Sequence, residues 1–300
     1  MTFKFRKLFK YFFIFTLLSL FFPFPALAKD YAITQVEIQA DLNQDGSMQV
    51  EERRTYDFDG NYTFAYQYLE KQPDQSKNPG RTEPYQIQVN SFCDQVGCYQ
   101  RKPENQVRSS DNQTYFVRQE SDRTYVKWFY QADNEPKTFT LNYTVPNAVT
   151  FHHDVASLYW QFIGSDWDKT QSDIDITVNL PSGIPDDQIQ AYAHGQLGGA
   201  VSIPRSDQVK LTIGYLSLGN FYEARILMPK NVFNQNAGAT GSLTKEQIIT
   251  QEKQFIQASQ RKVRLGWGLL AVSASINIAI LFLVGQEVLE FIKYGKDKPL

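Results

Sequence analysis

The chain has 300 residues, enough for one or two domains, and a formal net charge of −2 at pH 7. A balance so close to neutral argues against a nucleic-acid binder, which would carry an excess of Lys and Arg. Aromatic residues make up 14% of the chain, and Tyr, Thr and Val are spread through its middle. This composition favours strands over helices.

The first 28 residues have the pattern of a secretory signal peptide. Basic residues precede a short apolar core over 11–22, and prolines then lead to Ala26-Leu27-Ala28, an A-x-A cleavage site. The apolar core is about a dozen residues long, which is short for an uncleaved membrane anchor. We therefore predict cleavage after Ala28 and export of the chain from Lys29 onwards.

The stretch 31–58 predicts a β-hairpin. Apolar residues alternate on one face before and after Asn43-Gln44-Asp45-Gly46, and a turn that ends in Asp-Gly is typical of hairpins. Further strand-like runs follow, at 62–69, 85–92, 114–118, 124–130, 138–145, 158–163, 174–180, 189–194, 209–213 and 222–227. Many short strands at regular spacing predict an all-β exported domain over 29–230, an antiparallel β-sandwich that is Ig-like in general architecture.

Residues 231–264 are expected to form a linker and a juxtamembrane helix. The run 234–242 is rich in small residues, and Thr244 then begins a helix with Gln247 placed for a capping box. An irregular apolar stripe along the following residues favours a helix that continues towards the membrane.

The stretch 265–284 is uncharged and mostly apolar. A helix of this length spans roughly 30 Å, the thickness of a bilayer's hydrocarbon core. We predict one transmembrane helix here, followed by a short cytoplasmic tail at 285–300. Lysines in the tail agree with a cytoplasmic C-terminus by the positive-inside rule, whereas basic residues just before the span do not. We therefore infer the orientation of the span from the signal peptide. The expected location is the cell membrane, single-pass, with the N-terminal domain extracytoplasmic.

Three passages give the chain a resemblance to a known family. They are Asp30-Tyr31-Ala32-Ile33 with Asp45-Gly46-Ser47, Val50-Glu51-Glu52 and Tyr56-Asp57-Phe58-Asp59-Gly60; Ile163-Gly164-Ser165-Asp166-Trp167 with Leu180-Pro181; and Ala193-His194-Gly195 with Gly198. In order and spacing the chain resembles the exported N-terminal domain and first span of the YciQ-type predicted membrane proteins, a family of unknown function. The resemblance implies a membrane protein and supplies no activity. Family members usually carry a Gly-rich turn and an Arg where this chain has residues 61–66.

One motif matches a calcium-binding loop. Asp41, Asn43, Asp45 and Glu52 fall at the spacing D-x-[DN]-x-[DN]-G-x5-E, which supplies oxygen ligands at alternate positions and a bidentate Glu. That loop needs flanking helices, whereas both flanks here alternate with a period of two. We favour a plain hairpin and keep calcium binding as a hypothesis.

Cys93 and Cys98 are the two cysteines of the chain. An exported domain is in an oxidising compartment, so we expect a local disulfide rather than free thiols or a metal site. A disulfide that closes such a short loop would stabilise the folded state by about 2 kcal/mol and would mainly fix the local turn.

Histidines and tryptophans raise two further possibilities. His152, His153 and Asp154, with His194 elsewhere, could serve acid-base or metal chemistry, but adjacent strand residues point to opposite faces and nothing in the spacing requires a site. We expect Trp128, Trp160 and Trp167 to be core aromatics, with an exposed carbohydrate platform as the alternative. Asp166 and Asp168, which flank Trp167, suit a turn or a paired carboxylate.

One face of the predicted span carries small and polar residues. Ala271, Ser275 and Ala279 lie four apart, and Asn277 is polar at mid-depth. Small residues allow close helix approach, and a buried Asn can bond across an interface. The face therefore indicates helix association, although small residues are common in spans.

Three functions remain open from the sequence. We expect a non-enzymatic binding or interaction module of the cell envelope, with no cofactor, whose partner is another membrane or envelope protein. A structural subunit assembled through its span is the first alternative. An envelope hydrolase that uses His152, Asp154 or His194 is the second.

Overall fold

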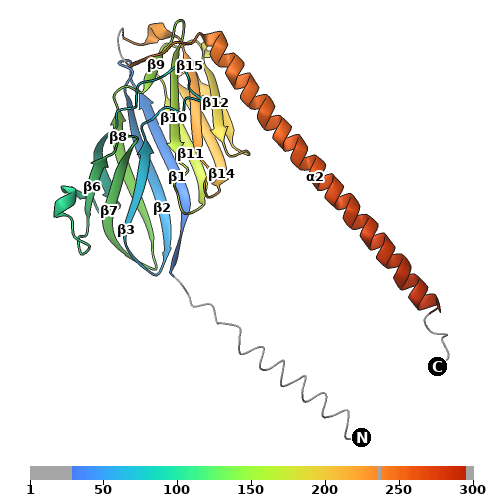
Figure 1. Ribbon diagram of the computed structural model, residues 1–300. Helices are drawn as coiled ribbons and strands as arrows, with labels where there is room; N and C mark the ends of the chain where they lie inside the picture. The colour runs from blue at the N-terminus through green and yellow to red at the C-terminus, as the bar shows by residue number, and fades with distance from the viewer. Residues whose placement is uncertain (1–28, 235–237, 295–300) are drawn as a thin grey trace. The chain divides into compact units, whose positions relative to one another are not determined.

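The computed structural model describes residues 29–234 and 238–294 (Figure 1). The chain forms two units, which divide between Ser242 and Leu243. The first unit is built of strands and the second is helical. The predicted signal peptide lies outside the described residues, as does the end of the predicted tail.

The largest sheet of the β unit has seven strands. Its order is β13 (Ala200–Arg205), β14 (Gln208–Leu216), β11 (Gln171–Asn179), β1 (Asp30–Leu42), β2 (Met48–Asp59), β8 (Pro136–Val145) and β4 (Gln88–Asp94). The predicted hairpin at 31–58 is confirmed, because β1 and β2 pair antiparallel with Leu42 opposite Met48. Val36, Ile38 and Ala40 are buried while the residues between them are exposed, so the alternation in the sequence identifies the inner face.

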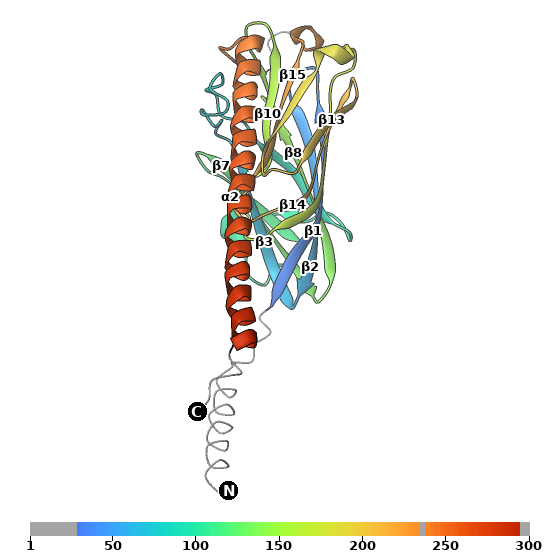
Figure 2. The same ribbon diagram turned by 90° about the vertical axis from the view of Figure 1, so that its right-hand side faces the viewer.

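Two smaller sheets complete the described part of the β unit. A five-stranded sheet has the order β12 (Gln190–Gly195), β15 (Tyr222–Met228), β10 (Ala156–Ile163), β9 (Val149–Phe151) and β16 (Ala239–Thr240). A four-stranded sheet has the order β3 (Asn61–Glu70), β7 (Arg123–Asp133), β6 (Thr114–Gln119) and β5 (Gln100–Arg101). Both views place β10 and β15 towards one end of the unit and β3 and β7 towards the other (Figures 1 and 2).

All three sheets contribute side chains to one buried core. Ile38 of β1, Leu158 of β10 and Val126 of β7 belong to the same cluster. The β domain that the sequence predicts is therefore confirmed. Packing one large sheet against two smaller ones buries the apolar faces of all three.

The pairing is not purely antiparallel. β1 pairs with β11 in parallel, with Ile38 opposite Ile176, and the short β5 and β16 also pair in parallel. Alternation in a sequence identifies which face of a strand is buried, but it carries no information about the direction of its partner. The sheets are accordingly mixed.

The second unit is one continuous helix, α2 (Lys245–Tyr294). The Thr244 amide donates to Gln247 Oε1 (2.8 Å) and the Gln247 amide donates to Thr244 Oγ1 (3.3 Å), which confirms the predicted capping box. Within the described ranges, α2 is the one helix long and apolar enough to cross a membrane, and it includes the predicted span without a break. Three short 3-10 turns, Glu104–Gln106, Asp186–Gln188 and Lys230–Val232, complete the described elements.

Candidate functional site

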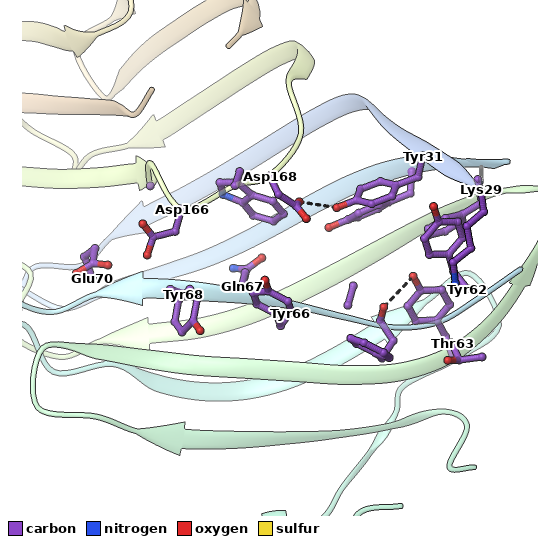
Figure 3. A pocket seen from close by; sticks show the side chains of 17 residues that line it. Lys29, Tyr31, Tyr62, Thr63, Tyr66, Gln67, Tyr68, Glu70, Asp166 and Asp168 are labelled. Carbon is purple, nitrogen blue, oxygen red and sulfur yellow. Dashed lines mark hydrogen bonds between the residues drawn. The ribbon is translucent and has the colours of Figure 1, made fainter. Parts of the chain in front are cut away.

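An aromatic pocket of about 230 Å³ lies along β3 (Figure 3). Seven consecutive residues, Tyr62–Tyr68, form one wall. The loop that follows β10 contributes Asp166, Trp167 and Asp168, and Tyr31 of β1 adds a further ring. Segments far apart in the sequence thus meet at one concave surface.

A β-bulge places the aromatic side chains of β3. The register of β3 on β7 shifts between Tyr62 and Phe64. Before the shift, Tyr62 packs against Tyr31 and Phe58, with ring centroids 5.5 and 5.0 Å apart. After the shift, Phe64 and Tyr66 are 49% and 41% exposed, a high exposure for such large apolar rings. The bulge therefore leads one strand from the core to the surface of the pocket.

The inner wall of the pocket is made of packed aromatic rings, and it includes a tyrosine, Tyr31, whose hydroxyl stays protonated. Tyr56 and Phe58 are stacked at 5.5 Å, and the Tyr31 hydroxyl donates to Asp168 Oδ1 at 2.6 Å. Burial raises the pKa of Tyr31, and the Asp168 carboxylate adds to this effect. Tyr31 is thus a neutral donor that holds Asp168 at the pocket.

Behind the pocket lies a buried polar network. Arg54 pairs with Glu52 and also donates to Gln67 Oε1 (3.2 Å). The Gln67 amide and the Tyr143 hydroxyl both donate to Glu52, at 3.0 and 2.7 Å. The Trp167 ring covers the Arg54 guanidinium at 4.7 Å. Since Gln67 and Trp167 also line the pocket, the network fixes two of its walls.

Carboxylates outnumber cations in the described lining, which contains Glu70, Asp166 and Asp168 but a single lysine, Lys29. Figure 3 shows Glu70 and Asp166 at one end of the pocket and Lys29 at the other. Burial raises the pKa of Glu70, and the charge of Asp166 raises it further. The end of the pocket near Glu70 is therefore acidic.

The candidate calcium residues are not brought together. Glu52 is fully buried in the network and faces the core, opposite Ile38 on β1. Asp45 accepts from the Ser47 amide and hydroxyl in the turn, and Asp41 accepts from Asn179 Nδ2 (2.6 Å). Asn43 donates to Ser47 Oγ (3.0 Å). Side chains that alternate across a strand pair cannot wrap one ion, so the segment is a plain hairpin.

The candidate catalytic residues lie apart. His152 is buried and contacts Ser157 Oγ at 3.1 Å, whereas Asp154 is exposed. His194 is on β12, which is separated from β9 by two intervening strands, β15 and β10, and its ring packs on Tyr159 at 5.8 Å. Three inter-strand spacings place these two sheet positions roughly 14 Å apart. Among the described residues, no group of three metal-ligating side chains could hold an ion.

The remaining sequence-predicted residues lie away from the pocket. Cys93 and Cys98 form a disulfide that closes the turn after β4. In α2, Ser275 donates to the Ala271 carbonyl and Asn277 to the Ser273 carbonyl, each at 2.8 Å. Ala271, Ser275 and Ala279 are exposed on one face of the helix, whereas Asn277, also exposed, points to the opposite side because it lies two residues from Ser275 and from Ala279. Association through this face remains a prediction.

Sequence reasoning missed the pocket itself. Trp128 and Trp160 are buried core aromatics, as expected, but Trp167 is half-buried at the pocket. Tyr62, Phe64, Tyr66 and Tyr68 alternate in the sequence, and the bulge turns Tyr62 towards the core rings while the other three share the opposite face of β3. The alternation of Phe64, Tyr66 and Tyr68 was the signal available for a surface aromatic row.

Comparison with known proteins gives the class and then the family. A β domain followed by one apolar helix defines a membrane protein with a single candidate span. Residues 32–228 match the family described as "Predicted membrane protein (DUF2207) N-terminal domain", and the chain belongs to this family. This confirms the family of unknown function that the three sequence passages indicate. No curated protein matches the chain.

Solved structures give distant likenesses. A putative protease from Parabacteroides distasonis is 9% identical with a TM-score of 0.35, over 65% of this chain and 40% of that one. Yeast LTA4 hydrolase in complex with bestatin is 8% identical with a TM-score of 0.38, over 66% and 28%. An M1 zinc metallopeptidase from Deinococcus radiodurans is 9% identical with a TM-score of 0.34, over 66% and 42%. This chain spans less than half of each of these proteins, and likenesses at this level carry no argument about function.

Proposed function

We propose that the protein is a membrane-anchored binding module, with no catalytic activity, whose β domain holds a ligand in the aromatic pocket outside the cytoplasm. The exposed rings of Phe64 and Tyr66 within a pocket backed by a rigid polar network carry this proposal. Binding sites are typically concave and largely aromatic, with a few polar groups that orient the ligand. This pocket has that composition.

Two observations support the location of the β domain on the extracytoplasmic side of the membrane. The first residues read as a secretory signal, and Cys93 and Cys98 form a disulfide, a bond that persists in oxidising compartments. In intact cells, a membrane-impermeant thiol reagent should label a cysteine placed at exposed Glu51. A control cysteine at Lys293 should be labelled after permeabilisation alone. The reverse labelling would contradict the proposed orientation.

Photo-crosslinking tests whether the pocket binds. A photoreactive phenylalanine replaces Tyr66 in the full chain, and the matched control carries it at Tyr215, which is 58% exposed on β14. We expect an adduct in cells from position 66, absent from position 215 and lost when Phe64→Ala is added. Identical adducts from both positions would show that the pocket has no special role.

Assembly through the span is a second candidate function. The exposed face of Ala271, Ser275 and Ala279 favours it, because small residues let helices approach closely. Replacement of 265–284 by a poly-Leu span tests it. Loss of a co-purified membrane partner in this variant, with pocket crosslinks retained, would favour assembly over ligand binding as the main role of the protein.

A further inference from the structure

The pocket follows an open sheet edge. In the described sheets β3 pairs with β7 on one side and with no strand on the other. The wall of the pocket is seven consecutive residues of this edge strand. An edge strand presents unpaired amide and carbonyl groups, and an extended peptide can pair with them. The long, continuous β3 wall therefore matches a strand-shaped ligand better than a compact one.

The chemistry near Glu70 suits a cation. The Glu70 carboxylate makes no hydrogen bond or ion pair with any side chain or backbone group that the structure describes, although the Glu70 backbone pairs with that of Arg123 in the sheet. Arg123 is close to it, but its Nε donates to Glu120 (2.8 Å) and its NH1 to Asp166 (3.1 Å). The one lysine of the lining is at the far end of the pocket (Figure 3). One carboxylate at this end thus remains without a cation of its own.

Aromatic rings around the pocket already attract cations. The Arg123 guanidinium lies 3.9 Å from the Tyr68 ring centroid, the Lys29 ammonium 4.8 Å from Tyr62, and the Lys169 ammonium 5.2 Å from Tyr31. Ring faces carry negative electrostatic potential, and they bind ammonium and guanidinium groups most strongly when water is excluded. A cationic ligand group would meet the same kind of surface next to Glu70.

We propose that the pocket binds an extended peptide that pairs with the free edge of β3 and places a lysine or arginine side chain against Glu70 and Asp166. The inference rests on the proposed function, because both use the same pocket. A neutral sugar would stack on the rings and leave the Glu70 charge unpaired. An acidic peptide would be repelled by the carboxylates.

Binding of synthetic peptides to the full chain in nanodiscs tests the cationic part. Each fluorescent pentapeptide has a fixed central residue and flanks randomised among Ser, Thr and Val. We expect peptides with central Lys or Arg to bind about tenfold tighter than those with norleucine, and those with Glu to bind weakest. Glu70→Gln should remove most of the Lys preference. The control Glu51→Gln removes an exposed carboxylate on β2, outside the pocket, and should leave the Lys preference unchanged.

Two further probes test the strand pairing. N-methylation of the peptide next to its central Lys removes a backbone donor and should weaken binding about tenfold. Free n-butylamine, which carries the same ammonium, should not displace the labelled peptide at the concentration at which the unlabelled peptide does. Displacement by butylamine at that concentration would overturn pairing with β3.

The outcomes separate this inference from the proposed function. Equal binding of the Lys and norleucine peptides, abolished in both cases by Tyr66→Ala, would overturn the cationic part and leave the pocket as a binding site. No binding by any peptide, with the Tyr66 crosslink still formed, would overturn the inference alone. No peptide binding and no position-specific crosslink would overturn both.

Discussion

Two glutamates on strands that follow one another in the chain, Glu52 of β2 and Glu70 of β3, show how differently the molecule treats charge in its interior and at its pocket. The Glu52 side chain is fully buried, and it accepts from Arg54, Gln67 and Tyr143. Glu70 is half-buried, and within the described chain nothing donates to its carboxylate. A buried charge costs several kcal/mol unless it is paired, so the network is needed to keep the Glu52 carboxylate in the core without that cost. A carboxylate left open at a concave surface is instead available to a ligand.

The largest effect should come from breaking the buried network. Arg54→Met leaves the Glu52 charge uncompensated in the core, and we expect a loss of about 3–5 kcal/mol in the free energy of unfolding. Denaturant titration of the full chain in detergent micelles measures it. The double variant Glu52→Leu/Arg54→Met removes both charges and should recover at least half of the loss. A single-variant loss below about 1 kcal/mol would show that water reaches Glu52.

His152 offers a third case, a buried group that avoids charge altogether. Burial lowers its pKa to about 4, below the ordinary value of 6.5, so the folded state keeps the ring neutral. The unfolded chain then binds more protons below pH 6.5, and the stability present above that pH is lost as the pH falls towards 4. The loss should be about 3 kcal/mol. Between pH 7.5 and 4, the denaturant midpoint should fall less steeply with pH in His152→Gln than in the wild-type protein. The same pH dependence in both proteins would show that other groups cause the acid sensitivity.

At the pocket, binding and stability should separate. Tyr66 is 41% exposed, so Tyr66→Ala should change the free energy of unfolding by less than about 1 kcal/mol while abolishing peptide binding and crosslinking. Thermal unfolding and anisotropy on the same preparation measure both quantities. A large loss of stability would mean that the ring belongs to the core, and the contrast with the network would fail.

The smallest expected effect is a gain in stability, whereas the preceding variants are expected to lose stability or leave it almost unchanged. The pKa of Glu70 is raised in the folded state, so ionisation at neutral pH costs stability, which is regained as the pH falls through this raised pKa and is fully regained below the ordinary value of 4.5. Glu70→Gln should therefore stabilise the protein at pH 7 by a few tenths of a kcal/mol, a gain limited by solvent screening. The gain should vanish at pH 3.5. Destabilisation at pH 7 would instead point to a bond made by the charged carboxylate.

Sequence patterns predict the fold better than the site, for a physical reason. Alternation in 31–58 and in most later runs identifies strands and inner faces, because burial acts on nearby residues with a fixed period. β13 was missed because its residues are mostly exposed and include Pro204, which gives no alternation. Parallel pairing of β1 with β11 could not be predicted, since nothing local encodes a partner well over a hundred residues away.

The pocket needs what a single strand cannot show. Tyr31, Tyr66 and Asp168 come from three segments and meet only after the sheets pack. The motif with the best sequence match, at Asp41–Glu52, is a hairpin because both flanks are strands. Spacing along the chain therefore predicts a site only when the local structure assumed for the motif is also formed.

The parallel pairing of β1 with β11 has a consequence for how the chain folds. β1 lies between β2 and β11, so one side of the N-terminal hairpin stays open until residues 171–179 arrive. Contacts of such long sequence separation make folding slow, and unpaired edges in the waiting chain promote aggregation. We therefore expect the first hairpin to stay open to chaperones and proteases until β11 pairs with it, and variants that weaken β11 should lower the yield before they alter the finished fold.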